Sequence, residues 1–297
     1  MKEESPLTEE KTSPLLGFIC AVLMAGIWAG FIVVSRLGAL SPLTIYDMAA
    51  LRFGFAGLLL LPATYLWWPR HLSLFQILVL AGGTGVPYVL LAYTGFLFAP
   101  VSHGGVFING TLPIFATLIT VVWLGSRPSV QTWIAIFVIL SGCALTAFAK
   151  DGFGNLNSLI GDAFFMTAAF SMAVYMPATR TWTVSLKELL AMVPIVNAVL
   201  FIPIWWLFLP TNLAASPMED ILIQMIYQGL GPSILGLIFF YLAIKHLGTT
   251  PTAAIVAVVP TIASLAGIPI LQETPVPLEW IGMFLVTTGI WLTLRAD

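Results

Sequence analysis

The chain has 297 residues, of which 59% are hydrophobic and only 8% are charged, and its mean hydropathy is +1.01. An ordinary soluble domain carries about 25% charged residues, so this composition excludes that class and predicts an integral membrane protein. The formal net charge of −2 and the lack of a basic patch in the sequence argue against nucleic acid as a partner.

Apolar segments follow one another along nearly the whole chain. A helix needs about 20 apolar residues to cross the hydrocarbon core of a bilayer, where no water is available to satisfy backbone groups. The sequence therefore predicts an all-α integral membrane fold. Its ten expected spans lie at residues 15–35, 46–68, 73–98, 102–124, 129–149, 158–179, 188–209, 220–244, 250–272 and 278–295.

Residues 1–14 precede the first span and are polar. They lack the short apolar stretch and small-residue cleavage site of a secretory signal, so we expect a cytoplasmic tail and a retained first helix. Lys and Arg accumulate on the cytoplasmic side of membrane proteins. With the N-terminus inside, eight of them fall in inner segments and only Arg36 and Lys150 in outer ones, which places both termini in the cytoplasm.

The second half of the chain repeats the first. Residues 96–147 match a segment 147 positions later, so that Pro113, for example, recurs as Pro260. Each copy holds five spans, and an odd number gives the two copies opposite orientations in the membrane. Inverted repeats of this kind are typical of carriers that work by alternating access. The predicted tail, first repeat and second repeat are residues 1–14, 15–149 and 150–297.

Corresponding spans of the two repeats are interrupted by glycine and proline. The third span contains AGGTGVPY at 81–88, and the eighth contains QGLGPS at 228–233. Proline lacks an N–H and glycine loosens a helix, so we expect breaks that serve as bending points. Paired breaks indicate a binding site near the membrane centre, although flexible packing would explain either one alone. The expected break residues are Gly83, Gly85, Pro87, Gly231 and Pro232.

Several side chains within the spans are candidate solute contacts. Nine of the ten tryptophans fall near predicted helix ends, whereas Trp28 lies inside the first span among small residues. Trp28 has two interpretations, which are core packing and a cavity wall that encloses an apolar side chain. For the polar candidates, the alternative to solute contact is a structural hydrogen bond. These candidates are Tyr88, Tyr93, Asn109, Tyr227, Gln228 and Ser233.

Three charged or titratable residues receive separate interpretations. Arg52 is the only strongly charged side chain more than a turn inside a span. It could bind a substrate carboxylate, but snorkelling, or pairing with Asp47 or another outer polar group, is the favoured interpretation. Asp162 lies one turn into the sixth span on its outer side, where the helix dipole favours a structural carboxylate. His103, in the turn before the fourth span, is expected to be an exposed loop histidine.

Short motifs at the span ends carry a family pattern. They are LRF at 51–53, WLG at 123–125 and LQETP at 271–275. From about residue 15 to 295 the chain resembles the EamA module of the drug/metabolite transporter superfamily, and within it the bacterial amino acid exporters related to YddG. The family usually closes the fourth and ninth spans with Gly-Glu. This chain departs from that pattern at Ser126 in the first copy and at Gln272 in the second.

The resemblance implies a ten-helix export carrier of the bacterial inner membrane. Its central cavity would be lined chiefly by the first, third, fourth, sixth, eighth and ninth helices. We predict a carrier, functional as a monomer and surrounded by membrane lipid, that exports small amphiphilic metabolites by alternating access. Amino acids with aromatic or other apolar side chains are the expected substrates, and ion coupling is left open.

Other functions remain as alternatives. An exporter of drug-like or other metabolites would share the same fold. A polytopic enzyme acting on lipid would need clustered acidic, basic or histidine side chains at one interface, and a scaffold would not need paired helix breaks. The sequence contains no Walker loop, metal-ligand spacing or activated nucleophile, so we expect neither an enzyme nor a cofactor or metal.

Overall fold

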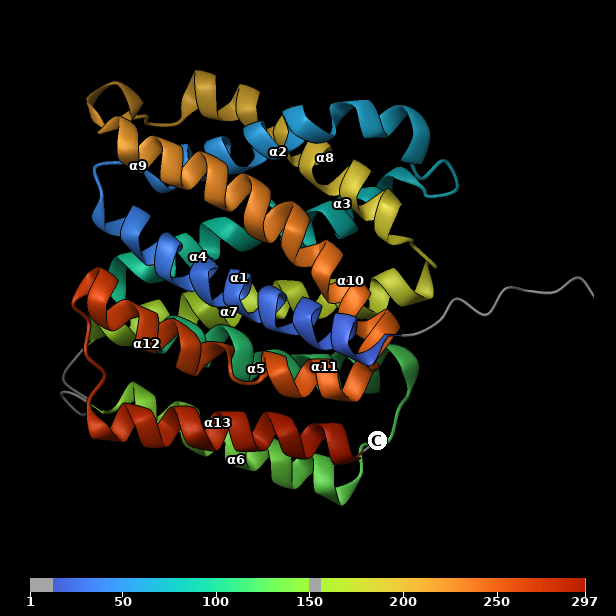
Figure 1. The fold of residues 1–297 in the computed structure, drawn as a ribbon, viewed down its shortest axis with the longest axis vertical. Coiled ribbons are helices and arrows are strands. Elements are labelled where there is room, and N and C mark those ends of the chain that lie inside the picture. Colours follow the sequence, from blue (N-terminus) through green and yellow to red (C-terminus); the bar gives the residue numbers. More distant parts are fainter. Residues whose placement is uncertain (1–12, 150–155, 297) are drawn as a thin grey trace, which may run out of the picture.

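A computed structural model describes residues 13–149 and 156–296 of the chain (Figure 1). Within these residues, ten helical spans are long and apolar enough to cross a membrane, so the predicted all-α fold with ten spans is confirmed. The first five spans are α1 (Pro14–Leu40), α2 (Ile45–Trp67), α3 (Leu74–Thr84) with α4 (Val86–Phe98), α5 (Val101–Leu124) and α6 (Val130–Ala147).

The second five spans follow the same order. The sixth and seventh are α7 (Leu156–Thr181) and α8 (Leu186–Phe208), and the 3₁₀ turn η2 (Leu213–Ala215) follows them. The eighth consists of α9 (Met218–Leu222), the π-helical segments η3 (Ile223–Gln228) and η4 (Gly231–Leu235), and α10 (Gly236–Leu247). The ninth and tenth are α11 (Thr249–Val256) with α12 (Val259–Leu271), and α13 (Pro277–Ala296).

Capping boxes begin the second span of each half. The Asp47 backbone N–H donates to Thr44 Oγ1, and the Asp47 carboxylate accepts from the Thr44 N–H, both at 3.0 Å. Ser185 and Glu188 make the same reciprocal pair at the start of α8. These contacts satisfy N–H groups that have no partner in the first turn of a helix. Asp47 and Glu188 therefore begin corresponding helices of the two halves.

The third span is broken at Gly85. α3 ends at Thr84, and α4 begins at Val86 with a proline in its first turn. The buried side chain of Asn197, from α8, fills the break. Its Oδ1 accepts from the Val86 N–H at 2.7 Å, and its Nδ2 donates to the Ala81 carbonyl at 2.9 Å. One amide therefore satisfies two of the backbone groups that the broken helix leaves free.

The eighth span is distorted rather than broken. η3 and η4 are π-helical, and Pro232 lies in the first turn of η4. The Ser233 hydroxyl donates to the Gln228 carbonyl at 2.9 Å, an acceptor whose α-helical donor position is occupied by Pro232, which has no N–H. Both interrupted spans therefore carry a side-chain hydrogen bond at the interruption. That the two interruptions act as bending points stays a prediction.

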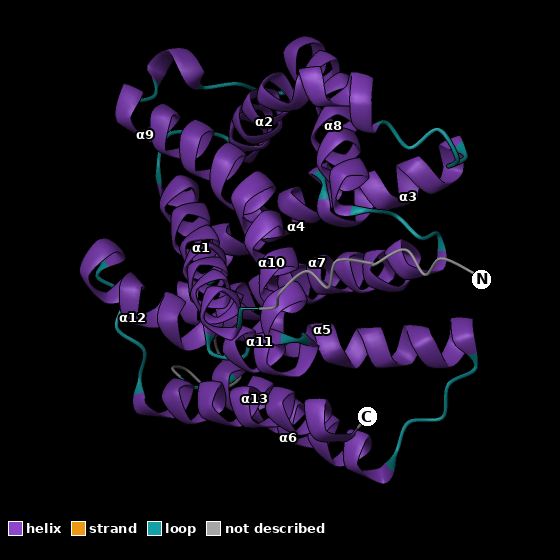
Figure 2. Cartoon of the chain, turned by 45° about the vertical axis from the view of Figure 1, so that its right-hand side comes forward, coloured by secondary structure: helices purple, strands orange, loops and turns teal. Residues whose placement is uncertain are grey.

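The two ends of the bundle are distinct. Because ten spans alternate in direction, α1 begins and α13 finishes at the same end, which we call the terminal end (Figure 1). The other end, where α1 finishes and α13 begins, is called the opposite end. Helices of the two halves pack against one another in pairs, among them α2 with α8, α5 with α7 and α6 with α13. Figure 2 shows α6 and α13 side by side along one flank of the molecule.

Small residues bring α6 and α13 into close contact. A Cβ atom placed on Gly142 would lie 2.6 Å from the Gly282 carbonyl oxygen, which is too close for any side chain. The outward faces of the spans are apolar, with side chains such as Phe75, Phe137 and Phe284 largely exposed. Exposed apolar faces on ten spans fit a lipid environment, so the chain is a multi-pass membrane protein.

Candidate functional site

A cavity of about 410 Å³ lies in the middle of the bundle. Every described span except that of α6 contributes to its walls. The six spans that the family resemblance implies are all among them, and the second, seventh and tenth spans also line the cavity. The cavity begins at the depth of Phe31 and Ile108, about two turns from the opposite end. It continues to Thr293 and Leu294 in the last turn of α13, at the terminal end.

Arg52 is part of the cavity wall and is only 6% exposed. Its Nε donates to Ser233 Oγ at 3.0 Å, and its Nη1 donates to Gln228 Oε1 at 3.2 Å. Its guanidinium carbon lies 5.2 Å from the ring centre of Phe31 and 5.4 Å from that of Phe53. All four of these partners are neutral.

The expected pairing of Arg52 with Asp47 is wrong, and its polar partners are Ser233 and Gln228 on the eighth span. Asp47 Oδ1 instead accepts from Trp205 Nε1 at 3.0 Å, and Oδ2 accepts from the Asn212 N–H at 2.9 Å. The described residues form no ion pair with Arg52, and Arg52 alone is charged among those that line the cavity. A buried guanidinium without a counter-ion is costly, so this wall favours an anionic group in the cavity.

Aromatic side chains form much of the remaining wall. Trp28 is half-buried and packs against Phe240 with ring centres 5.4 Å apart. Phe31 stacks on Tyr88 at 6.2 Å, and both line the cavity. The large apolar surfaces of such rings suit an apolar side chain. Their negative faces suit an ammonium group.

The other predicted contacts separate into two groups. Asn109 lines the cavity beside Trp28, Tyr88, Ser233 and Pro232, and its Nδ2 donates to the Gly105 carbonyl at 3.1 Å. The remaining polar candidates do not line the cavity, and neither do the other predicted break residues; we describe them as lying behind the wall. The group behind the wall contains Tyr93, Tyr227, Gln228, Gly83, Gly85, Pro87 and Gly231. Direct contact between any of these residues and a solute stays a prediction.

The residues behind the wall have structural partners. Tyr93 is fully buried, and its ring centre lies 6.4 Å from that of Phe31. The Tyr227 hydroxyl donates to the Ile27 carbonyl at 3.1 Å. Gln228 donates from Nε2 to Ser35 Oγ at 3.1 Å while its Oε1 accepts from Arg52. The last two link the eighth span to α1, and Gln228 also orients the guanidinium.

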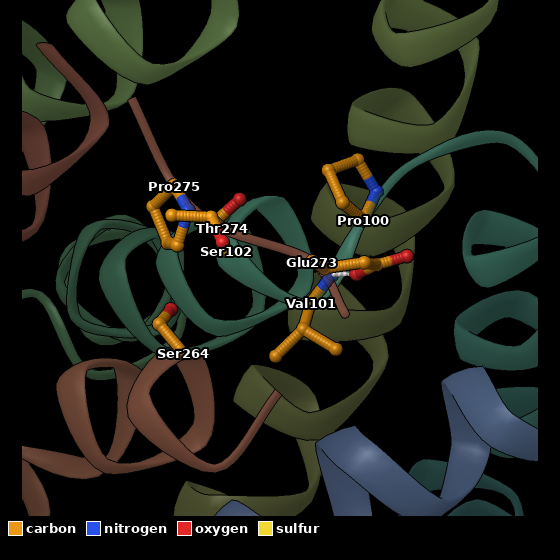
Figure 3. Close-up of a pocket in the computed structure, with 7 residues that line it drawn as sticks. All are labelled: Pro100, Val101, Ser102, Ser264, Glu273, Thr274 and Pro275. Atoms are coloured by element: carbon orange, nitrogen blue, oxygen red, sulfur yellow. Dashed lines mark hydrogen bonds between the residues drawn. The ribbon is translucent and has the colours of Figure 1, made fainter. Parts of the chain in front are cut away.

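The opposite end is closed by a charged contact. Arg36 Nε lies 2.7 Å from Glu273 Oε1, and Arg36 also donates from Nη1 to the Phe96 carbonyl. The other Glu273 oxygen accepts from the Val101 N–H at 2.9 Å, as Figure 3 shows. The space beside this contact holds only about 10 Å³, enough for a water molecule at most.

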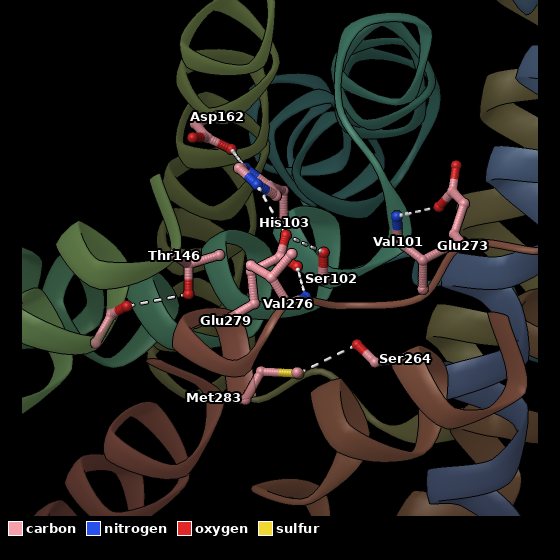
Figure 4. Close-up of polar contacts among 11 residues, drawn as sticks. Val101, Ser102, His103, Thr146, Asp162, Ser264, Glu273, Val276, Glu279 and Met283 are labelled. Carbon is pink, nitrogen blue, oxygen red and sulfur yellow. Dashed lines mark hydrogen bonds and ion pairs between the residues drawn. The ribbon is translucent and has the colours of Figure 1, made fainter. Parts of the chain in front are cut away.

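His103 is not an exposed loop residue, and that expectation is wrong. It lies in the first turn of α5 with its side chain 5% exposed. Its Nδ1 is 2.8 Å from Asp162 Oδ1 and its Nε2 is 3.4 Å from Glu279 Oε1 (Figure 4). Glu279 also accepts from Ser102 Oγ at 3.0 Å and from the Val276 N–H at 2.7 Å. We call His103, Asp162 and Glu279 the charged triad.

Sequence reasoning missed Glu279 and Asn197. Glu279 appears in the sequence only as an acidic residue at a helix start, which is the ordinary signature of a cap. Asn197 is a polar amide in the middle of an apolar run, and that was a usable signal because such amides need an inward partner. Asp162 is more than a dipole partner, since it pairs with a histidine from the other half.

Comparison with known proteins identifies the class. Residues 15–148 and 159–295 each match the EamA-like transporter family, and the chain belongs to that family. The family model thus matches the chain twice, once in each half. The fold and family together define a multi-pass membrane transporter.

Individual relatives are more distant. The chain is 27% identical over 236 residues to the "Probable terminal-alkyne amino-acid exporter" of Streptantibioticus cattleyicolor, covering 76% of this chain and 75% of the relative. It is 27% identical over 213 residues to the "Uncharacterized transporter YwfM" of Bacillus subtilis, covering 68% of each. A solved crystal structure superposes with a TM-score of 0.65 at 20% identity, covering 95% of this chain and 96% of that one, and shows the shared fold.

Proposed function

We propose that the protein exports amino acids with apolar or aromatic side chains across the bacterial inner membrane by alternating access, with both termini in the cytoplasm and with a monomer as the working unit. The observation that carries the proposal is Arg52 on the cavity wall with only neutral partners. A guanidinium binds a carboxylate through two parallel hydrogen bonds, and the α-carboxylate is common to all amino acids.

The rest of the cavity supports the same solute class. Its volume of about 410 Å³ falls in the range of roughly 300–1,000 Å³ of small-molecule sites. Apolar and aromatic walls suit the side chain, and the α-amino group has the Tyr88 ring face and the Asn109 and Ser233 oxygens within the same cavity. The name of the Streptantibioticus relative, an amino-acid exporter, agrees with this choice.

The shape of the cavity supports export. It extends to the last turn of α13 at the terminal end, while the Arg36–Glu273 contact closes the opposite end. With cytoplasmic termini, this state takes up its solute from inside the cell. Release then requires the opposite end to open and the terminal end to close, as rocking of the two halves would achieve.

Transport by the purified protein in liposomes tests the proposal. We expect saturable flux of a labelled apolar amino acid, with strong competition by other amino acids and weak competition by the corresponding amines, which lack the carboxylate. Arg52→Gln should lose the preference for the acid over the amine, and Arg70→Gln, at an exposed loop position, is the matched control. Equal competition by acid and amine in the wild type would contradict the role of Arg52.

The same assay separates the alternatives. A panel that includes drug-like cations and other metabolites identifies a carrier with a different substrate range. If folded and inserted protein transports no compound of the panel, the result would contradict a carrier and favour an enzyme or a scaffold.

A further inference from the structure

The charged triad connects the two halves of the bundle at the opposite end. His103 belongs to α5 in the first half, and Asp162 and Glu279 belong to α7 and α13 in the second. Figure 4 shows the imidazole between the two carboxylates. The three side chains are 5%, 5% and 0% exposed, so water contributes little to their solvation.

The protonation of the triad follows from its geometry. Both ring nitrogens face carboxylate oxygens, and only the imidazolium form donates from both. One imidazolium between two ionised carboxylates leaves a net charge of −1. Glu279 is well supplied with donors, from Ser102 and Val276 as well as His103. Asp162 is not, because its Oδ2 is buried and has no hydrogen-bond partner among the described residues.

We propose that the charged triad is a proton-binding site, in which Asp162 Oδ2 takes up one proton from the compartment at the opposite end and thereby weakens the His103–Asp162 contact, which holds this end closed together with the Arg36–Glu273 pair. The inference rests on the proposed carrier function, because it assigns to that carrier an ion that moves in exchange for the solute. The proton enters on the one buried oxygen where its binding breaks no described hydrogen bond.

The step conserves charge and needs no other reactant. One proton from water neutralises Asp162, so the triad changes from a net charge of −1 to zero. His103 then keeps only Glu279 as an anionic partner, which weakens the connection between α5 and α7. Because coupling is reciprocal, opening of this end takes up the proton and closing releases it.

The surroundings contain few other groups that could bind this proton. On α6, the Cys143 thiol interacts electrostatically with Asp162. Arg36 and Glu273 lie beside the start of α5 but are paired with each other. The three side chains of the triad, like the rest of the described residues, do not form a group that could hold a metal ion, so the geometry favours a proton.

Spin labels on the full-length protein test the site without a solute. Leu40→Cys, at the end of α1, and Leu156→Cys, at the start of α7, are exposed and belong to different halves at the opposite end. The native cysteines are buried and stay in place, and the parent protein shows whether they become labelled. We expect mild acid to increase severalfold the population with a long distance between the labels.

Substitutions assign this response to the triad. Asp162→Asn mimics the protonated carboxyl, so it should show the long distance at neutral pH and respond no further to acid. Glu279→Gln provides a second test if Asp162→Asn does not fold, and it should also reduce the response. Glu188→Gln, from the partly exposed His71–Glu188 pair at the terminal end, is the matched control and should respond like the wild type.

Flux separates this inference from the proposed function. In liposomes, Asp162→Asn should keep solute exchange but lose acceleration by a pH gradient. Wild-type protein that carries amino acids but shows no acid response in the distances would overturn the proton site alone. Protein that opens with acid but carries no amino acid would overturn the proposed substrate alone. A wild-type acid response in both triad variants would also overturn the proton site.

Discussion

The two ends of the bundle are held together by different contacts. At the opposite end, Arg36 and Glu273 are 15% and 19% exposed, and the charged triad is more deeply buried. At the terminal end, the His71–Glu188 pair joins the halves at 3.3 Å with side chains 49% and 22% exposed. Exposed pairs contribute about 0–1 kcal/mol, whereas breaking a buried pair is far more costly.

This difference matches the shape of the cavity. The cavity stops about two turns short of the end that carries buried charge contacts between the halves, and it extends to the end where the His71–Glu188 contact is partly exposed. In an alternating-access carrier, a closed end must be stable enough to hold and weak enough to release. Arg36 and Glu273 provide the strongest test of that balance, because they are partly buried and make additional hydrogen bonds to the backbone.

Arg36→Gln should have the largest effect on the balance between the two ends. It removes the charge partner of Glu273 and leaves that carboxylate near the membrane without a cation, so the closed opposite end should lose about 1–3 kcal/mol, or roughly 5- to 150-fold in population. The spin-label pair at this end measures the shift. His71→Gln at the terminal end should change stability by less than about 0.5 kcal/mol. Equal effects at the two ends would contradict the comparison.

Asn197→Ala probes the break that lies between the two ends. The change removes hydrogen bonds to Val86 and Ala81, and each buried backbone group left unsatisfied costs about 1–3 kcal/mol. We expect a lower midpoint of thermal unfolding. Asn109→Ala is the control, since that amide donates only to its own helix among the described contacts. A thermal midpoint unchanged by Asn197→Ala would show that water replaces the amide.

Trp28→Ala should have the smallest of the three effects, and it tests the apolar wall. Loss of part of the surface that faces the solute should weaken binding of large apolar amino acids by about 1 kcal/mol, or roughly fivefold, with folding largely intact. Competition in the transport assay measures this change. Trp206→Ala, at a side chain that is 76% exposed, is the control. If the two variants transport equally well, Trp28 is a packing residue only.

The sequence predicted the fold more completely than the site. The expected span at 46–68 is observed as Ile45–Trp67, and the expected span at 250–272 is observed at Thr249–Leu271. Spans are predictable because length and hydrophobicity are local properties of the chain. The interruptions in the third and eighth spans were visible for the same reason, since Gly and Pro act on their own helix.

Contacts between distant residues could not be predicted in this way. Arg52 was expected near Asp47, five positions away, yet it bonds to Ser233. His103 was expected to be exposed to water because it was placed in a turn, yet its side chain is buried and contacts Asp162 and Glu279. In each case the partner lies on another span, and the packing of the helices decides which side chains meet.

The sequence by itself therefore determined the membrane location, the ten spans, the internal repeat and the interrupted third and eighth helices, because each depends on composition or on short patterns along the chain. Only the tertiary structure decided that Arg52 stands in a cavity with neutral partners, that Asn197 fills the break at Gly85, and that one histidine lies between two carboxylates of the other half. The reason is physical: in a low-dielectric interior each polar group must find a partner, and the partner comes from whichever helix packs beside it.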